Sequence, residues 1–450
     1  MRITGGLVVT AAGVRRADVV VAGQRIASLG PRAGRGGESI DAEGCYVLPG
    51  GVDPHTHILA DVAAATRSAA FGGTTTALSF SNPQAGESNL AAVIRGSRQL
   101  EGHSAIDVAL HAMIGQPDRL TAEHLERIRR LGVCGVKLFL AYPELGLMAS
   151  DGSLYRVLRE AARLGLLVQV HCENGALIQA LIDEYLARGK RQTPYFAHSR
   201  PPEVEEEAVA RTLAIAQLAG APVYLTHMTT AGGVRLVRAA RANGQTAHAE
   251  VCLHHLLLDA GRYRGKHAAR FLVAPPLRSP VHREALWSAV ARGTVDTIGS
   301  DHAQSLYKPQ PANTGDFRSI PYGFPGIELR LPLLLSEGLR RRIPIQRLAE
   351  LAATRPAQLF GVPRKGVIRP GADADLVVWD PRPEWRVKAA ALHDGLGDTP
   401  YAGMRVRGAI RFVFLRGRLL IANGEFVGSD SLGRYVETGL LNPRSSRRRS

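Results

Sequence analysis

Cysteine, lysine and long apolar runs are scarce in this sequence. The few cysteines and the short apolar runs argue against a disulfide-stabilised protein and a membrane protein. The four cysteines lie far apart and form no Cys-x-x-Cys pair, which disfavours a disulfide framework or a thiolate zinc site. No stretch approaches the roughly 18–20 apolar residues of a membrane span. The first residues lack the basic start, apolar core and cleavage site of a signal peptide. We expect a cytoplasmic protein without a membrane partner.

Positive charge is abundant, but it comes almost entirely from arginine. The formal net charge is +16, and the 56 basic residues include only six lysines. Most arginines are spread along apparent helices, and no nucleic-acid-binding motif is present. The charge therefore favours solubility over a nucleic-acid partner. The last residues, PRSSRRRS, are short and basic, which predicts a disordered tail.

Both ends of the chain have a β-rich pattern. Residues 1–48 contain short apolar strands separated by glycine turns, and the same pattern returns in residues 365–430. Two such ends predict one small β-sandwich domain built from both termini. Residues 49–364 would form a catalytic domain, and residues 431–450 a C-terminal extension that ends in the basic tail.

Between the two ends, apolar runs of strand length alternate with helical patterns. This alternation is typical of an α/β protein with a parallel sheet. Eight strand–helix repeats predict a (β/α)8 barrel of the TIM type. The eight runs are CYVLPGGVDPHTH, TTTALSF, DVALHAMI, GVKLFLA, LVQVHCE, PVYLTHMT, TAHAEVCLHH and TVDTIGSDHA.

Polar residues stand at the carboxyl ends of four of these runs, where a barrel of this kind carries its active site. His55 and His57 are two residues apart on one strand, so both imidazoles face the same side. His171, His227 and Asp301 end three further runs. A single such histidine is usually a hydrogen-bonded core residue, but a set in register predicts a metal site. These ligands suit zinc, with manganese, cobalt or iron as alternatives.

Lys137 interrupts an apolar run that should be a barrel strand. A buried ammonium group costs several kcal/mol unless it is paired or neutralised. Desolvation lowers the pKa of a lysine and frees the neutral amine, which can add carbon dioxide. The resulting carbamate is a carboxylate that can bridge two metal ions. The alternative is an ion pair with Asp301 or a glutamate, and the histidines at neighbouring strand ends favour the carboxylated form.

At these residues the sequence resembles the dihydropyrimidinase and D-hydantoinase family of the amidohydrolase superfamily. The resemblance implies a (β/α)8 barrel with a β-sandwich, a homotetramer, and hydrolysis of a small cyclic amide such as a hydantoin or dihydropyrimidine ring. It runs almost end to end. The segments that carry it are PGGVDPHTH, GGTTT, GVKLFLAY, DGSLYRVLREAARLGLLVQVHCEN, HSRPPEVEEEA, APPLRSPVHREALW, TIGSDHA, FPGIELRLPLL and RPGADADLVVWDP.

The resemblance also implies roles for individual residues. Tyr142, five residues after Lys137, would hydrogen-bond the substrate carbonyl, and Asp301 would shuttle a proton. Backbone groups at Ala274 and Tyr322 would line the ring, although relatives commonly carry Ser and Asn at these positions. The implied ligands are His55, His57, Lys137 and Asp301 for the first metal ion, and Lys137, His171 and His227 for the second.

The expected reaction is hydrolytic opening of the ring. Two divalent metal ions, with zinc the first choice, would lower the pKa of a bridging water and supply hydroxide at neutral pH. Tyr142 would help to stabilise the oxyanion, and Asp301 would pass a proton to the leaving nitrogen. A five- or six-membered cyclic diamide would open to an N-carbamoyl amino acid.

Two departures from the family pattern leave the substrate open. Only fourteen residues, Ile58–Phe71, separate His57 from Gly72, whereas typical hydantoinases have a longer loop that shapes the pocket for the ring's side group. The run VCLHHLLLD replaces one in which relatives usually have Pro, Gln and Tyr. His254 and His255 are therefore unusual, and we interpret them as residues of the pocket wall or core.

Two other functions stay open at this point. A dihydroorotase or allantoinase would share the metal centre, but Ile58, Leu59 and Ala60 stand where dihydroorotases usually have an arginine after the histidine pair. The other alternative is a non-catalytic scaffold related to dihydropyrimidinase. Such scaffolds have lost metal ligands, whereas all six are present in this sequence.

Overall fold

The computed structural model describes residues 1–30, 38–265, 267–307 and 315–439, and the chain divides into two units. The first unit contains Met1–Ser79, Ser97–Ala109 and Pro325–Val436. The second contains Phe80–Gly96, Leu110–Phe324 and the described residues that follow Val436. The disorder predicted for the basic tail falls on residues 440–450, outside the described residues. The domain boundaries at residues 48, 365 and 430 stay a prediction.

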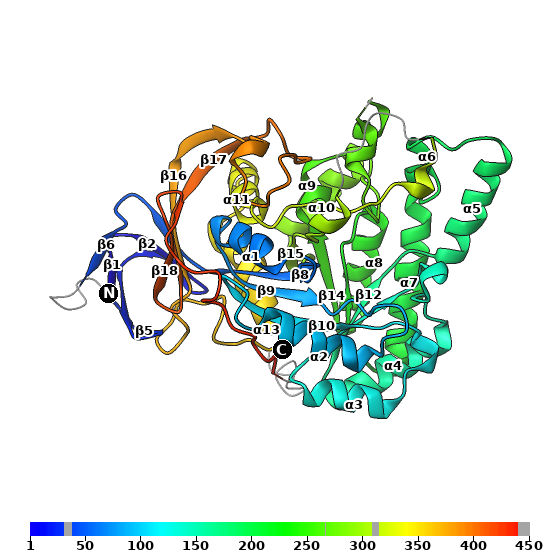
Figure 1. The fold of residues 1–450 in the computed structure, drawn as a ribbon, viewed down its shortest axis with the longest axis horizontal. Coiled ribbons are helices and arrows are strands. Elements are labelled where there is room, and N and C mark those ends of the chain that lie inside the picture. The colour runs from blue at the N-terminus through cyan, green and yellow to red at the C-terminus, as the bar shows by residue number, and fades with distance from the viewer. Residues whose placement is uncertain (31–37, 266, 308–314, 440–450) are drawn as a thin grey trace. The chain divides into compact units, whose positions relative to one another are not determined.

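Two β-sheets of the first unit form a sandwich (Figure 1). Their strands are β1 (Arg2–Thr4), β2 (Leu7–Thr10), β3 (Gly13–Arg16), β4 (Asp18–Ala22), β5 (Arg25–Gly30), β6 (Ser39–Asp41), β7 (Tyr46–Pro49), β16 (Leu376–Arg386), β17 (Arg405–Leu415), β18 (Arg418–Ala422) and β19 (Glu425–Phe426). The smaller sheet has the order β5-β4-β1-β6, and the larger has β19-β18-β17-β16-β7-β2-β3. Because β16 pairs antiparallel with β7, the larger sheet joins the two chain ends.

The sandwich core follows the two-residue period of its strands. In β4, Val19 and Val21 are buried while Val20 between them is more exposed, which gives the strand one buried apolar face. Val19 and Ile3 of the smaller sheet meet Val47 and Val378 of the larger in one apolar cluster. Burying a side chain of this size contributes about 1.5–3 kcal/mol. A one-residue slip of β4 would turn these valines outward.

A buried charge cluster lies beside this core in the first unit. The Lys365 ammonium group is 2.8 Å from a carboxylate oxygen of Asp375 and 3.0 Å from one of Asp373, and it also pairs with Asp107. Arg416 forms a second ion pair with Asp107. The surrounding carboxylates raise the pKa of Lys365 against the opposing effect of its burial. Lys365 is therefore a fully charged structural cation.

The first unit also holds the first strand–helix repeat of the central alternation, followed by a second strand whose last residue, Phe80, belongs to the second unit. These elements are β8 (Gly51–Thr56), α1 (Val62–Phe71) and β9 (Thr74–Phe80). β8 and β9 pair in parallel, and every residue of both strands is buried, as expected for a sheet covered on both faces. The later helices of this unit are α11 (Arg330–Arg340), α12 (Ile345–Ala349) and α13 (Arg355–Leu359).

The remaining six strands of the alternation are β10 (Asp107–Met113), β11 (Gly135–Phe139), β12 (Leu167–His171), β13 (Val223–Leu225), β14 (Ala247–Cys252) and β15 (Thr297–Gly299). Each pairs in parallel with the next one along the chain. The register places Phe139 opposite His171. The carboxyl ends of these parallel strands therefore lie along one edge of the sheet. The residues that follow each strand come close together at this edge.

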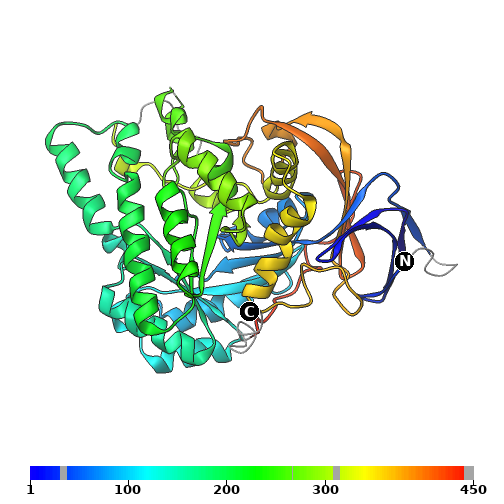
Figure 2. The ribbon, with the colours of Figure 1, turned by 180° about the vertical axis from the view of Figure 1, so that it is seen from behind.

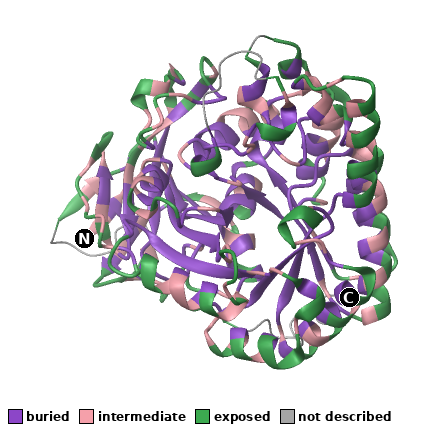
Figure 3. Cartoon of the chain, turned by 45° about the vertical axis from the view of Figure 1, so that its right-hand side comes forward, coloured by how far each residue is buried: buried purple, intermediate pink, exposed green. Residues whose placement is uncertain are grey.

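Helices connect these strands. They are α2 (Asn89–Leu100), α3 (Ala122–Arg130), α4 (Asp151–Leu164), α5 (Gly175–Ala187), α6 (Pro194–His198), α7 (Pro202–Ala219), α8 (Ala231–Ala242), α9 (Leu253–Leu257) and α10 (Pro280–Ala291). Both ribbon views show α4, α7 and α8 alongside the strands (Figures 1 and 2), where they contact β12, β13 and β14. Figure 3 shows buried strands and helices whose outer faces are exposed.

Local sequence sets both ends of α4. The Ser150 side chain accepts a hydrogen bond from the backbone N–H of Ser153, which caps the start of α4. Gly165 ends the helix with φ at 71°, in the left-handed region that glycine adopts without strain. Among the described residues, no helix has both the length and the apolar character needed to cross a bilayer.

All eight predicted runs contain a strand of the alternation. The prediction fails in detail for TAHAEVCLHH, because β14 stops at Cys252 and the two histidines begin the short helix α9. An apolar run cannot by itself distinguish a buried strand from a buried helical turn.

Candidate active site

His55 and His57 lie at the carboxyl end of β8 in the first unit. His55 is buried, His57 is half-buried, and their ring centroids are 5.7 Å apart. The backbone N–H of His55 donates to Asp53 Oδ1 at 3.2 Å. Asp53 also pairs with Arg330 at 3.4 Å, and neither side chain is exposed. A buried ion pair therefore holds the backbone that carries the His-x-His pair.

Lys137 lies in the middle of β11 and is only 1% exposed. Its Nζ donates to Thr226 Oγ1 at 2.6 Å and stands over the rings of Phe80 and Phe139 at 5.4 and 5.2 Å. Among the described residues, it forms no ion pair. Burial lowers the pKa of Lys137 to about 8, against the charges of Glu250 and Asp301, which raise it. The amine is therefore accessible in its neutral form.

His171 and His227 face each other in the second unit. Nδ1 of His171 is 3.0 Å from Nε2 of His227, and Nε2 of His171 is 2.9 Å from Oε2 of the buried Glu173. Because a carboxylate accepts, His171 donates through Nε2 and presents the Nδ1 lone pair to His227. Burial lowers the pKa of His171, which keeps the ring neutral. Two converging imidazole nitrogens fit a shared divalent cation.

Three of the predicted site residues have a left-handed backbone. Tyr142, His227 and Asp301 have φ values of 65°, 37° and 49°, and they are three of the eight such non-glycine residues among those described. Left-handed φ costs energy for residues with a side chain, and it persists where the surrounding structure enforces it. Each of the three lies shortly after the carboxyl end of a strand. The loops after three different strands therefore each contain a residue with an energetically unfavourable backbone conformation, which the surrounding structure must stabilise.

Tyr142 and Tyr322 lie beside each other. Their rings are stacked with centroids 6.4 Å apart, and Tyr142 is 5.2 Å from the ring of His171. Burial raises the pKa of Tyr142, and the hydrogen bond to Tyr322 raises it further. Tyr142 is therefore a protonated donor at neutral pH. The Arg200 guanidinium stands 5.9 Å from the Tyr322 ring, so a cation borders this end of the site.

Ala274 is half-buried and precedes Pro275 through a cis peptide bond. The Pro275 carbonyl oxygen is 3.0 Å from Nε2 of His255, so this segment packs against α9. The second unit thus brings together Lys137, His171 and His227, with the charge of Asp301 acting on Lys137. The metal-ligand and substrate roles of these residues stay predictions.

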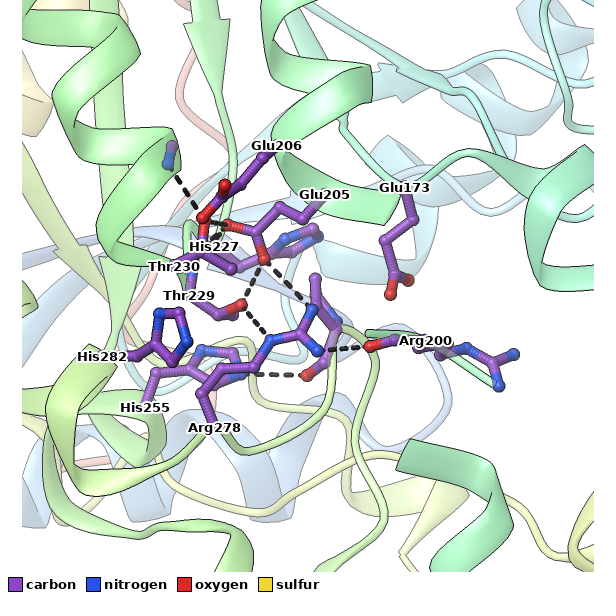
Figure 4. Close-up of polar contacts among 12 residues, drawn as sticks. Glu173, Arg200, Glu205, Glu206, His227, Thr229, Thr230, His255, Arg278 and His282 are labelled. Atoms are coloured by element: carbon purple, nitrogen blue, oxygen red, sulfur yellow. Dashed lines mark hydrogen bonds and ion pairs between the residues drawn. The ribbon is translucent and has the colours of Figure 1, made fainter. Parts of the chain in front are cut away.

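Sequence reasoning missed a buried polar cluster that supports the segment after His227 (Figure 4). Glu205 accepts hydrogen bonds from the backbone N–H groups of Thr229 and Thr230 at 2.8 and 3.0 Å. Arg278 donates to the Thr229 hydroxyl at 2.9 Å and pairs with Glu205 at 3.5 Å. No spacing signal could have linked these residues, because α7 and the loop after β13 meet only in the fold.

Glu173 was also missed, although a signal for it exists. It stands two residues after His171, so the two-residue period of an extended chain places both side chains on one side. A carboxylate next to a histidine ligand is the expected partner for the second ring nitrogen. The sequence HCE could therefore have been interpreted as a ligand with its supporting acid.

Comparisons with known proteins identify the class of the chain. A sequence model described as Amidohydrolase family matches residues 46–420. The chain belongs to this family. It is 38% identical over 451 residues to a D-hydantoinase of Ralstonia pickettii, which covers 97% of this chain and 98% of that protein.

Solved structures place it more closely within the family. A D-hydantoinase from a Bacillus sp. AR9 has a TM-score of 0.92 and 37% identity, covering 98% of this chain and 99% of that chain. A dihydropyrimidinase from Brevibacillus agri NCHU1002 has a TM-score of 0.92 and 36% identity, with the same coverage. The predicted family and the predicted (β/α)8 barrel with a β-sandwich are confirmed. Family membership makes the chain a hydrolase of the cyclic-amide type and implies a divalent metal cofactor.

Proposed function

We propose that this protein opens the ring of a hydantoin or dihydropyrimidine to give an N-carbamoyl amino acid, using two zinc ions. The relatives named D-hydantoinase and dihydropyrimidinase support the substrate class. The observation that carries the proposal is Lys137, a buried amine whose only hydrogen bond among the described residues is to Thr226. A buried ammonium without a counter-ion is costly, whereas a carbamate between cations is not.

The proposed ligand set follows the strand ends and the family pattern. Lys137, carboxylated by carbon dioxide, would bridge both ions. His171 and His227 already present nitrogen atoms 3.0 Å apart, which supports their sharing one ion. The proposed ligands are His55, His57, Lys137 and Asp301 for one ion, and Lys137, His171 and His227 for the other.

The residues of the site divide the chemistry between them. When bound, two divalent ions supply a nucleophile at neutral pH and polarise the ring carbonyl. Tyr142 donates its hydroxyl to the carbonyl oxygen as negative charge develops there. Asp301 accepts the proton of the attacking water and returns it to the leaving nitrogen. The backbone at Ala274 and Tyr322 holds the ring.

Lys137→Ala tests the bridge directly. We expect this variant to lose both bound ions, measured by elemental analysis, together with ring hydrolysis. Wild-type protein incubated with carbon-13 bicarbonate should show a carbamate carbon signal in NMR that the variant lacks. Lys388→Ala, at an exposed lysine, is the matched control and should keep the ions, the signal and the activity. Normal turnover in Lys137→Ala would contradict the proposal.

A substrate screen separates the proposed reaction from its alternatives. The screen compares hydantoin, 5-substituted hydantoins, dihydrouracil, dihydroorotate and allantoin on one metal-analysed sample. Turnover of dihydroorotate or allantoin alone would favour the dihydroorotase or allantoinase alternative. Metal-free protein without activity on any ring would favour the scaffold.

We place the enzyme in the cytoplasm as a homotetramer within the same proposal. The four cysteines, Cys45, Cys134, Cys172 and Cys252, are all buried free thiols, which suits a reducing compartment. The similarity to hydantoinases supports the tetramer. Light scattering of the purified protein tests the assembly, and a monomeric mass would contradict it.

A further inference from the structure

The second unit gathers a further group of metal-ligating side chains, none of which belongs to the proposed binuclear centre. Cys252 is the last residue of β14, and His254 and His255 follow at the start of α9. One ligand atom of each residue lies within 4.8 Å of those of the other two. None of the three residues is more than 2% exposed. A thiol and two imidazoles are therefore packed together away from bulk water.

The hydrogen bond of His255 determines which of its nitrogens can bind an ion. Its Nε2 is 3.0 Å from the carbonyl oxygen of Pro275. A carbonyl only accepts, so Nε2 carries the proton and Nδ1 holds the lone pair of the neutral ring. This Nδ1 is buried and has no hydrogen-bond partner among the described residues. Histidine ligands commonly have this arrangement, with the second ring nitrogen donating to a carbonyl.

His254 and Cys252 complete the group. The ring of His254 stands edge-on to that of His255, with centroids 4.1 Å apart, and packs 5.1 Å from the ring of Phe324. The Cys252 thiol points to Oε1 of Glu250 at 3.8 Å. A cation at Cys252 would displace the thiol proton, because thiolate is the form that binds metals.

The Arg278 guanidinium, whose charge acts on His255, is paired with other residues. Arg278 is drawn beside His255 in Figure 4, and it donates to the Thr229 hydroxyl and pairs with Glu205. Its charge is therefore balanced by a buried carboxylate. One thiolate and two imidazoles are then the groups that a cation at this position would meet.

We propose that Cys252, His254 and His255, none of which is a proposed ligand of the binuclear centre, form a third metal site that binds one borderline divalent cation such as Zn²⁺ or Co²⁺. Thiolate and imidazole ligands select such ions over Mg²⁺ or Ca²⁺. Three protein ligands leave a fourth tetrahedral position for water or a small ligand. Binding would bring the three ligand atoms to roughly 3.4–3.7 Å from one another, as the usual Zn–N and Zn–S distances require.

The sequence ties this site to the present chain. The family resemblance implies Pro, Gln and Tyr in this run, and these residues supply no imidazole. His254 and His255 therefore depart from the family pattern, which the proposed ligands of the binuclear centre follow. The third site also does not depend on the carboxylation of Lys137.

Cobalt titration tests the site, because thiolate ligation produces a near-ultraviolet charge-transfer absorption that histidine and carboxylate ligands do not give. Chelator-stripped full-length protein is titrated with cobalt(II) chloride under anaerobic conditions, and bound metal is counted in parallel. We expect three ions per chain and the thiolate band in the wild type. Cys252→Ser and His255→Gln should each bind one ion fewer, and Cys252→Ser should lose the band.

Three controls separate the outcomes. Cys45→Ser removes a buried thiol of the first unit and should keep the band. Lys137→Ala should lose two ions and keep the band, so failure of the binuclear proposal alone leaves the third site visible. Near-ultraviolet circular dichroism verifies that each variant is folded. A wild type without the band, or a band that persists in folded Cys252→Ser, would overturn the third site.

Discussion

Glu173 should control how tightly His171 holds a metal ion. Its Oε2 accepts the Nε2 proton of His171 at 2.9 Å, and the carboxylate is fully buried. Although burial opposes it, the hydrogen bond from His171 and the positive charges of Arg200 and Arg278 lower the pKa of Glu173, so the group is a carboxylate. Replacing Glu173 with leucine removes the acceptor and lets either nitrogen of His171 carry the proton. Replacing it with glutamine keeps a neutral acceptor.

The expected magnitudes separate these two variants. A hydrogen bond to a charged group contributes about 1.5–3 kcal/mol, and a neutral one about 0.5–1.5 kcal/mol. Loss of such a support typically costs 10–100-fold in metal affinity, or about 1.4–2.8 kcal/mol. We therefore expect Glu173→Leu to weaken the binding of one ion by about 10–100-fold, and Glu173→Gln by about tenfold or less.

The assay is a competition titration of zinc against a chromophoric chelator. Glu123→Gln, at an exposed position of α3, is the control and should match the wild type. Thermal melting of the metal-free variants shows whether the fold is intact. If folded Glu173→Leu binds every ion as tightly as the wild type, the carboxylate does not position His171 and the reasoning fails.

Two further predictions concern catalysis and stability. Tyr142→Phe should lower kcat by about 100–1000-fold through loss of one oxyanion donor, with metal content unchanged, and a normal kcat would exclude that role. Lys365→Met should lower the free energy of unfolding in urea by about 3–5 kcal/mol because it leaves buried carboxylates unpaired, whereas Lys388→Met should change it by no more than about 0.5 kcal/mol. This decrease in the free energy of unfolding should become smaller as pH falls, because burial raises the pKa of Asp375 and protonation removes its charge. An equal decrease at neutral and acidic pH would contradict this explanation.

The barrel strands could be predicted because parallel strands are buried on both faces. The strands in runs such as GVKLFLA and LVQVHCE are buried throughout, so their polar members are conspicuous. For the same reason, Lys137 and His171 could be identified from the amino-acid sequence alone. The β-sandwich could be predicted from short strands at both ends, and the pairing of Val47 with Val378 joins them.

Contacts between distant segments could not be predicted in this way. Glu205 meets Thr229 and Arg278 only after α7 has packed against the barrel strands, and no periodicity in the sequence encodes that meeting. The same holds for Lys365 and Asp107, which are 258 residues apart. The left-handed backbone at Tyr142 was equally hidden, since tyrosine is not a residue that signals positive φ.

The two buried lysines among the described residues show why the surroundings of a residue decide its chemistry. Lys365 has three carboxylates around it, which raise its pKa and fix it as a cation. Lys137 has a hydroxyl and two aromatic rings, and burial lowers its pKa to about 8. Burial alone therefore does not make a lysine reactive, because carboxylates that pair with the ammonium group hold its proton in place. The neutral amine of Lys137 can become an anion, and an anion is what two adjacent metal ions require.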